Sequence, residues 1–67
     1  MKLVPAVERA AKILDIVARH RAFPTVSDLA RELNLPKSSV HTLCRTLLEL
    51  NLLIRRSDQS YQLGPDL

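Results

Sequence analysis

The sequence predicts a mainly α-helical domain that ends in a small β-hairpin. Three segments, residues 5–20, 27–33 and 37–50, carry apolar side chains at helical spacing. A fourth segment, residues 52–63, contains two short β-prone runs separated by turn-forming residues, which is typical of a hairpin. With 67 residues and 46% hydrophobic content, the chain is expected to form one domain, residues 1–67, around a single core.

The first helix is expected to begin at Pro5, because proline has no N–H to leave unsatisfied in a first turn. At about 100° per residue, one side is apolar and is expected to face the core; it consists of Val7, Ala10, Ala11, Leu14, Val17 and Ala18. The opposite stripe is charged. Ile16 falls within that stripe and Ile13 at its edge. The two isoleucines are therefore either isolated exposed side chains or a helix-to-helix contact in a dimer.

The second helix is short and is preceded by residues that interrupt the helical period, Phe23-Pro24. The β-prone pair Thr25-Val26 could add a short strand to the sheet. Ser27 is expected to cap the helix, and Asp28 suits the dipole of its first turn. Asn34 tolerates the left-handed conformation that ends a helix. Since the next helix starts almost at once, the two form a helix-turn-helix.

The third helix has two contrasting faces. Its apolar face is expected to join the core and consists of Val40, Leu43, Cys44, Leu47 and Leu50. The opposite face carries Ser38, His41, Thr42 and Arg45. Small, hydroxyl and cationic side chains can enter a major groove of DNA and reach base edges. We therefore interpret this segment as a recognition helix.

After the third helix, Asn51 is expected to take the same left-handed capping role. Residues 52–56 form a predicted strand, residues 57–60 a turn, and residues 60–63 a return strand with alternating polar and apolar side chains. This hairpin, or wing, completes a winged helix-turn-helix. Residues 64–67 break the strand, as expected at a domain boundary.

The order of these elements, together with five short motifs, resembles the N-terminal domain of the IclR family of bacterial transcriptional regulators. The motifs are Val7–Leu14, Val26–Ala30, Leu35–His41, Leu47–Leu53 and Tyr61–Gly64. Each motif is weak alone, but their order and spacing are fairly specific. The resemblance therefore covers nearly the whole chain.

Three positions depart from the family pattern, which commonly has Arg at Thr42, Leu at Cys44 and Gly at Asn51. Because Thr42 is shorter than that arginine, no arginine-to-guanine contact is expected there, and Arg45 is expected to take the role one turn later. The resemblance implies a homodimer on a palindromic operator in double-stranded DNA, in the cytoplasm at the bacterial nucleoid. It also implies a C-terminal effector domain that binds a small molecule and is absent from these 67 residues.

Nine residues are expected to contact DNA: Lys37, Ser38, Ser39, His41, Thr42, Arg45, Arg55, Arg56 and Gln59. The first three lie at the start of the third helix, where N–H groups, hydroxyls and a lysine can hold a phosphate. The simpler alternative is that Ser38 or Ser39 only caps the helix.

Further along this helix, His41, Thr42 and Arg45 occupy adjacent turns from which side chains reach successive bases. Taken alone, they would equally suit a solvated helix face. The two arginines of the wing could clamp the DNA backbone or a minor groove, although one of them could simply face solvent. Gln59 would add a contact at the wing tip.

The remaining features exclude other classes of protein. A net charge of +3 and a pI of about 9.6 permit nucleic-acid binding without requiring it. The single cysteine, Cys44, is expected to be a core thiol in a reducing compartment. No motif predicts an enzyme, a metal site, a cofactor or a membrane span. The main alternative is a winged-helix module that docks another protein.

Overall fold

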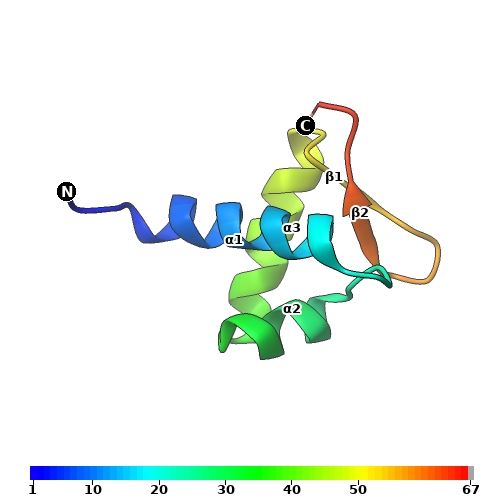
Figure 1. Ribbon diagram of the computed structural model, residues 1–67, viewed down its shortest axis with the longest axis horizontal. Coiled ribbons are helices and arrows are strands. Elements are labelled where there is room, and N and C mark those ends of the chain that lie inside the picture. Colours follow the sequence, from blue (N-terminus) through cyan, green and yellow to red (C-terminus); the bar gives the residue numbers. More distant parts are fainter. Residues whose placement is uncertain (67) are drawn as a thin grey trace.

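The computed structural model describes residues 1–66; Leu67, the last residue of the predicted domain, lies outside the described residues. Three helices precede a two-stranded antiparallel sheet: α1 (Pro5–Arg19), α2 (Val26–Leu33), α3 (Lys37–Glu49), β1 (Leu53–Arg55) and β2 (Tyr61–Leu63). The helix α1 crosses α3, α2 lies at one end of α3, and the hairpin lies to one side (Figure 1). The predicted winged helix-turn-helix is confirmed, and every helix ends within one residue of its expected boundary.

The core forms where α3 meets the other elements. It contains Ile13, Ile16 and Val17 of α1, Leu29 and Ala30 of α2, Val40, Cys44 and Leu47 of α3, and Leu53 and Tyr61 of the hairpin. Within residues 1–66, no helix is both long and apolar enough to cross a lipid bilayer.

The expected rotation of α1 about its own axis is wrong. Ile13 is fully buried and Ile16 is 9% exposed, whereas Val7 is 67% exposed. At about 100° per residue, the apolar arc from Ile16 to Ala11 is about 220° wide, more than the core can cover. The edge with the two isoleucines is the buried one, because larger apolar side chains gain more from leaving water. Neither isoleucine is therefore available for the predicted dimer contact.

The start of α2 also differs from expectation, because Thr25 is the cap and Ser27 is not. The Thr25 hydroxyl accepts a hydrogen bond from the Asp28 N–H at 3.3 Å, and the Thr25 N–H donates to the Asp28 carboxylate at 2.9 Å. This reciprocal capping box satisfies two donors at once. The expected strand is reduced to one bridge between Thr25 and Ser60, and Val26 opens the helix instead.

Three residues fix the ends of the helices and of the hairpin. Asn34 and Asn51 adopt the left-handed conformation at φ 55° and 60°, which confirms the predicted helix ends. Gly64 donates its N–H to the Leu52 carbonyl at 2.9 Å. A side chain on Gly64 would collide with the Asn51 carbonyl, so the last strand can return beside the end of α3 only with glycine there.

The wing is attached to the loop between α1 and α2 rather than projecting freely. The Tyr61 N–H donates to the Pro24 carbonyl at 2.8 Å, next to the bridge at Thr25. At the tip, the Gln59 N–H donates to the Arg56 carbonyl at 3.0 Å, and Gln59 is left-handed with φ 70°. The loop and the tight turn together fix the direction of the wing.

Candidate nucleic-acid interface

The outward face of α3 is set by the direction of its buried side chains. Opposite the buried face lie four exposed residues: Ser38, Thr42, Arg45 and Glu49. His41 is also exposed but lies roughly a quarter turn to one side, toward the wing. The structure therefore brings three of the six predicted α3 residues, Ser38, Thr42 and Arg45, onto one surface and separates His41 from its centre.

The start of α3 has unused hydrogen-bond donors. Its N-cap is Pro36, and no side chain caps the helix, so neither Ser38 nor Ser39 has that role. The Ser39 and Val40 N–H groups bond to the Pro36 carbonyl at 3.1 and 3.2 Å, which leaves the Lys37 and Ser38 N–H groups. A helix start of this kind attracts anions.

Thr42 has an intrahelical hydrogen bond that the sequence did not predict. Its hydroxyl donates to the Ser38 carbonyl at 3.0 Å, and the Thr46 hydroxyl donates to the Thr42 carbonyl at 3.2 Å. Such back-bonding is common for threonine within helices. The Thr42 hydroxyl is thus engaged with the helix itself, and its methyl group is the part left for an outside contact.

The two arginines of the wing have different surroundings. The Arg56 guanidinium lies 3.8 Å from the centre of the Phe23 ring and donates to the Gln62 side-chain carbonyl at 3.0 Å. Its Nε is also 4.0 Å from an Asp58 carboxylate oxygen. Arg55 has no acidic partner within residues 1–66. Arg56 therefore joins the wing to the preceding loop, while Arg55 is the freer cation.

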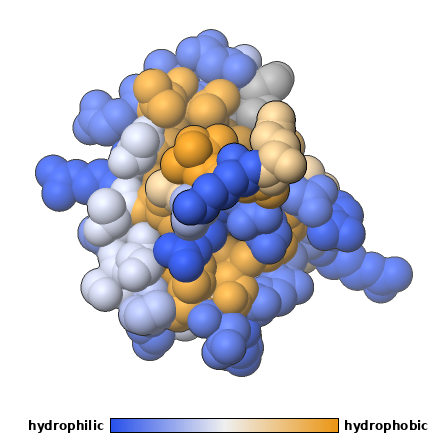
Figure 2. Space-filling view, turned by 90° about the vertical axis from the view of Figure 1, so that its left-hand side faces the viewer, coloured by the Kyte–Doolittle hydropathy of each residue, from blue (hydrophilic) through white to orange (hydrophobic). Residues whose placement is uncertain are grey.

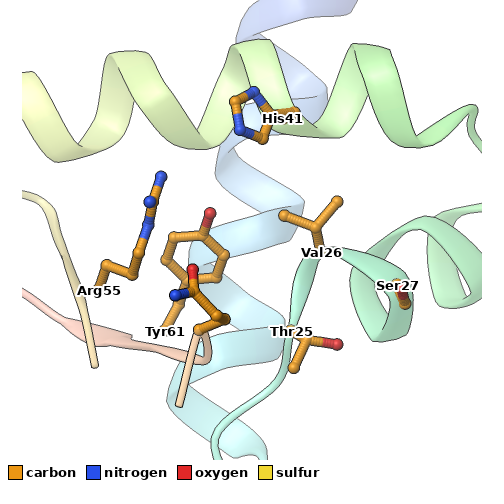
Figure 3. Close-up of a pocket in the computed structure, with 7 residues that line it drawn as sticks. Thr25, Val26, Ser27, His41, Arg55 and Tyr61 are labelled. Atoms are coloured by element: carbon orange, nitrogen blue, oxygen red, sulfur yellow. The ribbon is translucent and has the colours of Figure 1, made fainter. Parts of the chain in front are cut away.

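Arg55 belongs to a cleft of about 260 Å³ between α3, the start of α2 and the wing. The cleft is lined by Thr25, Val26, Ser27, His41, Arg55, Gln59 and Tyr61, most of them labelled in Figure 3. Burial is the largest cause that raises the pKa of Tyr61, so its hydroxyl remains a protonated donor at neutral pH. The structure thus gathers three predicted residues, His41, Arg55 and Gln59, at one place.

Four lining residues of the cleft were not predicted as site residues: Thr25, Val26, Ser27 and Tyr61. Ser27 was expected to cap α2, but in the structure Thr25 caps this helix, so Ser27 does not have that role. Tyr61 was assigned to a partly exposed strand, but it is only 2% exposed. For Ser27, the sequence contained a signal that it is not the cap, because the spacing from Thr25 to Asp28 is that of a capping box.

A second surface, between α1 and α3, is apolar. A groove of about 590 Å³ there is lined by Ala6, Val7, Ala10, Ala11, Leu14, Thr42, Leu43, Thr46, Leu47, Leu50 and Leu52. Leu50, expected in the core, is 56% exposed because it follows the last turn of α3 and opens onto this groove. Figure 2 shows hydrophobic surface framed by hydrophilic side chains on the side where α1 begins.

The thiol of Cys44 is fully buried, which confirms the predicted core role. Burial raises its pKa to about 11, so it is protonated and unreactive at neutral pH. Within the described part of the chain, no three His, Cys, Asp or Glu side chains lie together in a way that could hold a metal ion.

The fold and the exposed face of α3 define a winged helix-turn-helix of the DNA-binding type. Residues 6–57 match the model of the IclR helix-turn-helix domain, and the chain belongs to this family. Domains of this family bind DNA in transcriptional regulators, and the relatives that this chain resembles are such regulators.

Three relatives illustrate the family match. The probable HTH-type transcriptional regulator ArcR of Halobacterium salinarum is 34% identical over 61 residues, which are 91% of this chain and 23% of that protein. The repressor BlcR of Agobacterium tumefaciens is 44% identical with a TM-score of 0.88, over 98% of this chain and 27% of that one. An IclR transcriptional regulator from Alicyclobacillus acidocaldarius is 28% identical with a TM-score of 0.92, over 97% of this chain and 27% of that one. The chain thus spans about a quarter of the length of these relatives.

Proposed function

We propose that this domain binds double-stranded DNA sequence-specifically, with α3 in the major groove and the wing on the flanking backbone. The observation that carries the proposal is the outward face of α3, where hydroxyl and cationic side chains stand clear of the core. A major groove admits one helix, and side chains on its exposed face meet the base edges. The free N–H groups at the start of α3 suit a backbone phosphate.

The cations of α3 and the wing are compatible with this orientation. Lys37, Arg45 and Arg55 surround the proposed interface, and none of them has an acidic partner within residues 1–66. Unpaired cations on one surface are available to replace the counterions of DNA phosphates.

Within this interface, Arg45 is the residue assigned to base reading. A guanidinium can bond guanine through two parallel N–H groups, which gives direct readout. The Thr42 hydroxyl is occupied by the Ser38 carbonyl, so Thr42 would contribute its methyl group, which suits apolar contact with a thymine methyl.

The test is binding of the chain to a randomised duplex library at two salt concentrations, followed by sequencing of the retained DNA. Arg45→Ala should weaken binding to the enriched sequence by about 1 to 3 kcal/mol and relax the preference at one base pair. Arg19→Ala is the matched control, because it removes an exposed arginine of α1 that pairs with Asp15. Unchanged affinity and sequence preference for Arg45→Ala would overturn its assignment.

We further propose that two copies bind a palindromic operator and meet through the exposed apolar side chains at the start of α1, beside the apolar groove. Helix-turn-helix dimers place two recognition helices one DNA turn apart. Leu3, Val4 and Val7 are 57%, 63% and 67% exposed, an unusual apolar strip for a small soluble domain. Glu8 and Lys12 flank that strip one turn apart. An antiparallel, two-fold pairing of α1 helices would set each Glu8 beside the Lys12 of the second copy.

Sedimentation equilibrium of Val7→Asp tests this contact. The variant should self-associate more weakly and lose affinity for a two-half-site duplex, while binding to a single half-site stays unchanged. Undiminished self-association would place the contact elsewhere.

A C-terminal effector domain that binds a small molecule completes the proposal. The supporting fact is that the chain spans about a quarter of the length of its relatives. DNA binding by a longer protein with this sequence at its N-terminus, measured with and without candidate ligands, would test it. Regulation by ligand of the 67-residue chain alone would contradict it.

A further inference from the structure

The cleft between α3, α2 and the wing is lined by hydrogen-bond donors. Arg55 brings a guanidinium, His41 an imidazole and Ser27 a hydroxyl, and no carboxylate is among its lining residues. The nearest acid in sequence, Asp28, is engaged by the Thr25 N–H at 2.9 Å and by Arg31 at 2.7 Å. A cleft with donors and no acidic lining residue is complementary to an anion.

The start of α2 adds one backbone donor. The capping box satisfies the Asp28 N–H with the Thr25 hydroxyl, and the Leu29 N–H bonds to the Thr25 carbonyl at 3.0 Å. The Ser27 N–H has no acceptor within residues 1–66, whereas the antiparallel bridge between Thr25 and Ser60 directs the Val26 N–H toward the Gln59 carbonyl. Both residues line the cleft, so the unsatisfied end of the helix faces it.

The hydroxyl of Tyr61 adds a side-chain donor to the cleft. Tyr61 is 2% exposed, and its ring is packed in the core, yet its hydroxyl lies on the side of the cleft that faces α3 (Figure 3). Arg55 lies alongside it and can only donate. No acceptor within residues 1–66 takes the hydroxyl proton of Tyr61. The Tyr61 hydroxyl can therefore donate its proton to an acceptor that enters the cleft.

We propose that this cleft is a binding site for one phosphate of the DNA backbone, held by Arg55, the Tyr61 hydroxyl and the Ser27 N–H group. The site rests on the proposed DNA-binding function, because it lies between the recognition helix and the wing. His41 borders the same cleft from α3. The bound phosphate would therefore tie the wing and α2 to the backbone beside the groove that α3 enters, and it would fix the register of α3.

The experiment uses the duplex enriched from the randomised library and a set of copies that each carry one neutral methylphosphonate. Three proteins are compared with the unaltered chain: Tyr61→Phe, Arg55→Gln, and the control Arg19→Gln. Tyr61→Phe removes one hydroxyl and keeps the buried ring, and its unfolding midpoint is measured to verify folding.

Tyr61→Phe should weaken duplex binding about tenfold without changing its salt dependence, since it removes a hydrogen bond to a charged group but no charge. Arg55→Gln should lower the slope of log affinity against log salt by about 1, and Arg19→Gln should leave affinity at the level of the unaltered chain. At one phosphate position in each half-site, the methylphosphonate should weaken duplex binding by the unaltered chain about tenfold. It should weaken binding by the Arg55→Gln variant much less.

Each other outcome overturns the proposal in a recognisable way. If the duplex binds but every methylphosphonate weakens the unaltered chain's binding and the binding of the Arg55→Gln and Tyr61→Phe variants by the same factor, the cleft assignment fails and the DNA-binding function stands. If, in addition, inorganic phosphate shifts the NMR signals of His41 and Ser27, the cleft holds free anions and not the DNA backbone. If no duplex is retained even at low salt, the proposed function and the cleft site fail together.

Discussion

Replacement of Ile13 by valine tests the rotation of α1 that the structure establishes. Ile13 has no exposed surface, so Ile13→Val removes one methylene from the packed core. Transfer of a methylene to water costs about 0.8 kcal/mol, and with the small cavity left behind the usual loss is 0.5–1.5 kcal/mol, or about 1 kcal/mol. In a domain of 60 to 100 residues, a loss of about 1 kcal/mol lowers the melting temperature by about 4 to 8 °C.

The matched control is Val7→Ala on the same helix. Val7 is 67% exposed, so at a protein concentration at which the chain is monomeric its truncation should change stability by less than about 0.5 kcal/mol. Thermal and urea unfolding followed by circular dichroism measure both variants, and sedimentation equilibrium measures their self-association. An Ile13→Val variant with unchanged stability but weaker self-association would refute the core position and restore the isoleucines to a dimer surface.

Three further predictions concern the wing and the start of α2. A double-mutant cycle of Phe23→Leu and Arg56→Gln should give a coupling of about 0.5 to 1 kcal/mol in the free energy of urea unfolding, because the guanidinium lies 3.8 Å from the ring centre. Additive losses would show that the stacking contributes nothing. Gln59→Gly should stabilise the domain by up to about 1 kcal/mol, because Gln59 has φ 70° and glycine adopts this conformation without strain; a lower melting temperature would show that the Gln59 side chain is needed by the fold. The hydrogen bonds from the Thr25 N–H and hydroxyl hold the pKa of Asp28 below its usual value, so the stability that they contribute is complete above about pH 4 and is lost as the pH falls through the folded-state pKa. The urea midpoint of Asp28→Asn should therefore fall less steeply on acidification than that of the unaltered chain, and identical acid profiles would rule out this linkage.

Local sequence signals were sufficient for the order of the elements. Helix ends depend on residues within a turn of each other, and Asn34 and Asn51 have the left-handed backbone that such ends require. The division of α3 into a core face and a polar face was also available from the sequence, because an isolated apolar stripe at helical spacing has one natural orientation. The Thr25 cap was missed although its partner Asp28 stands at capping-box spacing.

The sequence by itself thus determined the three helices, the wing and the polar face of α3, since these depend on contacts between near neighbours. Only the tertiary structure decided which edge of the wide apolar arc of α1 is buried, because that depends on the shape of the surface it packs against. The same holds for Arg55 and Arg56: neighbours on a strand point to opposite sides, but the sequence does not say which side meets DNA. The hydrogen bond from the Tyr61 N–H to the Pro24 carbonyl anchors the wing to the loop before α2. In this position Arg56 stacks on Phe23 and Arg55 lines the cleft.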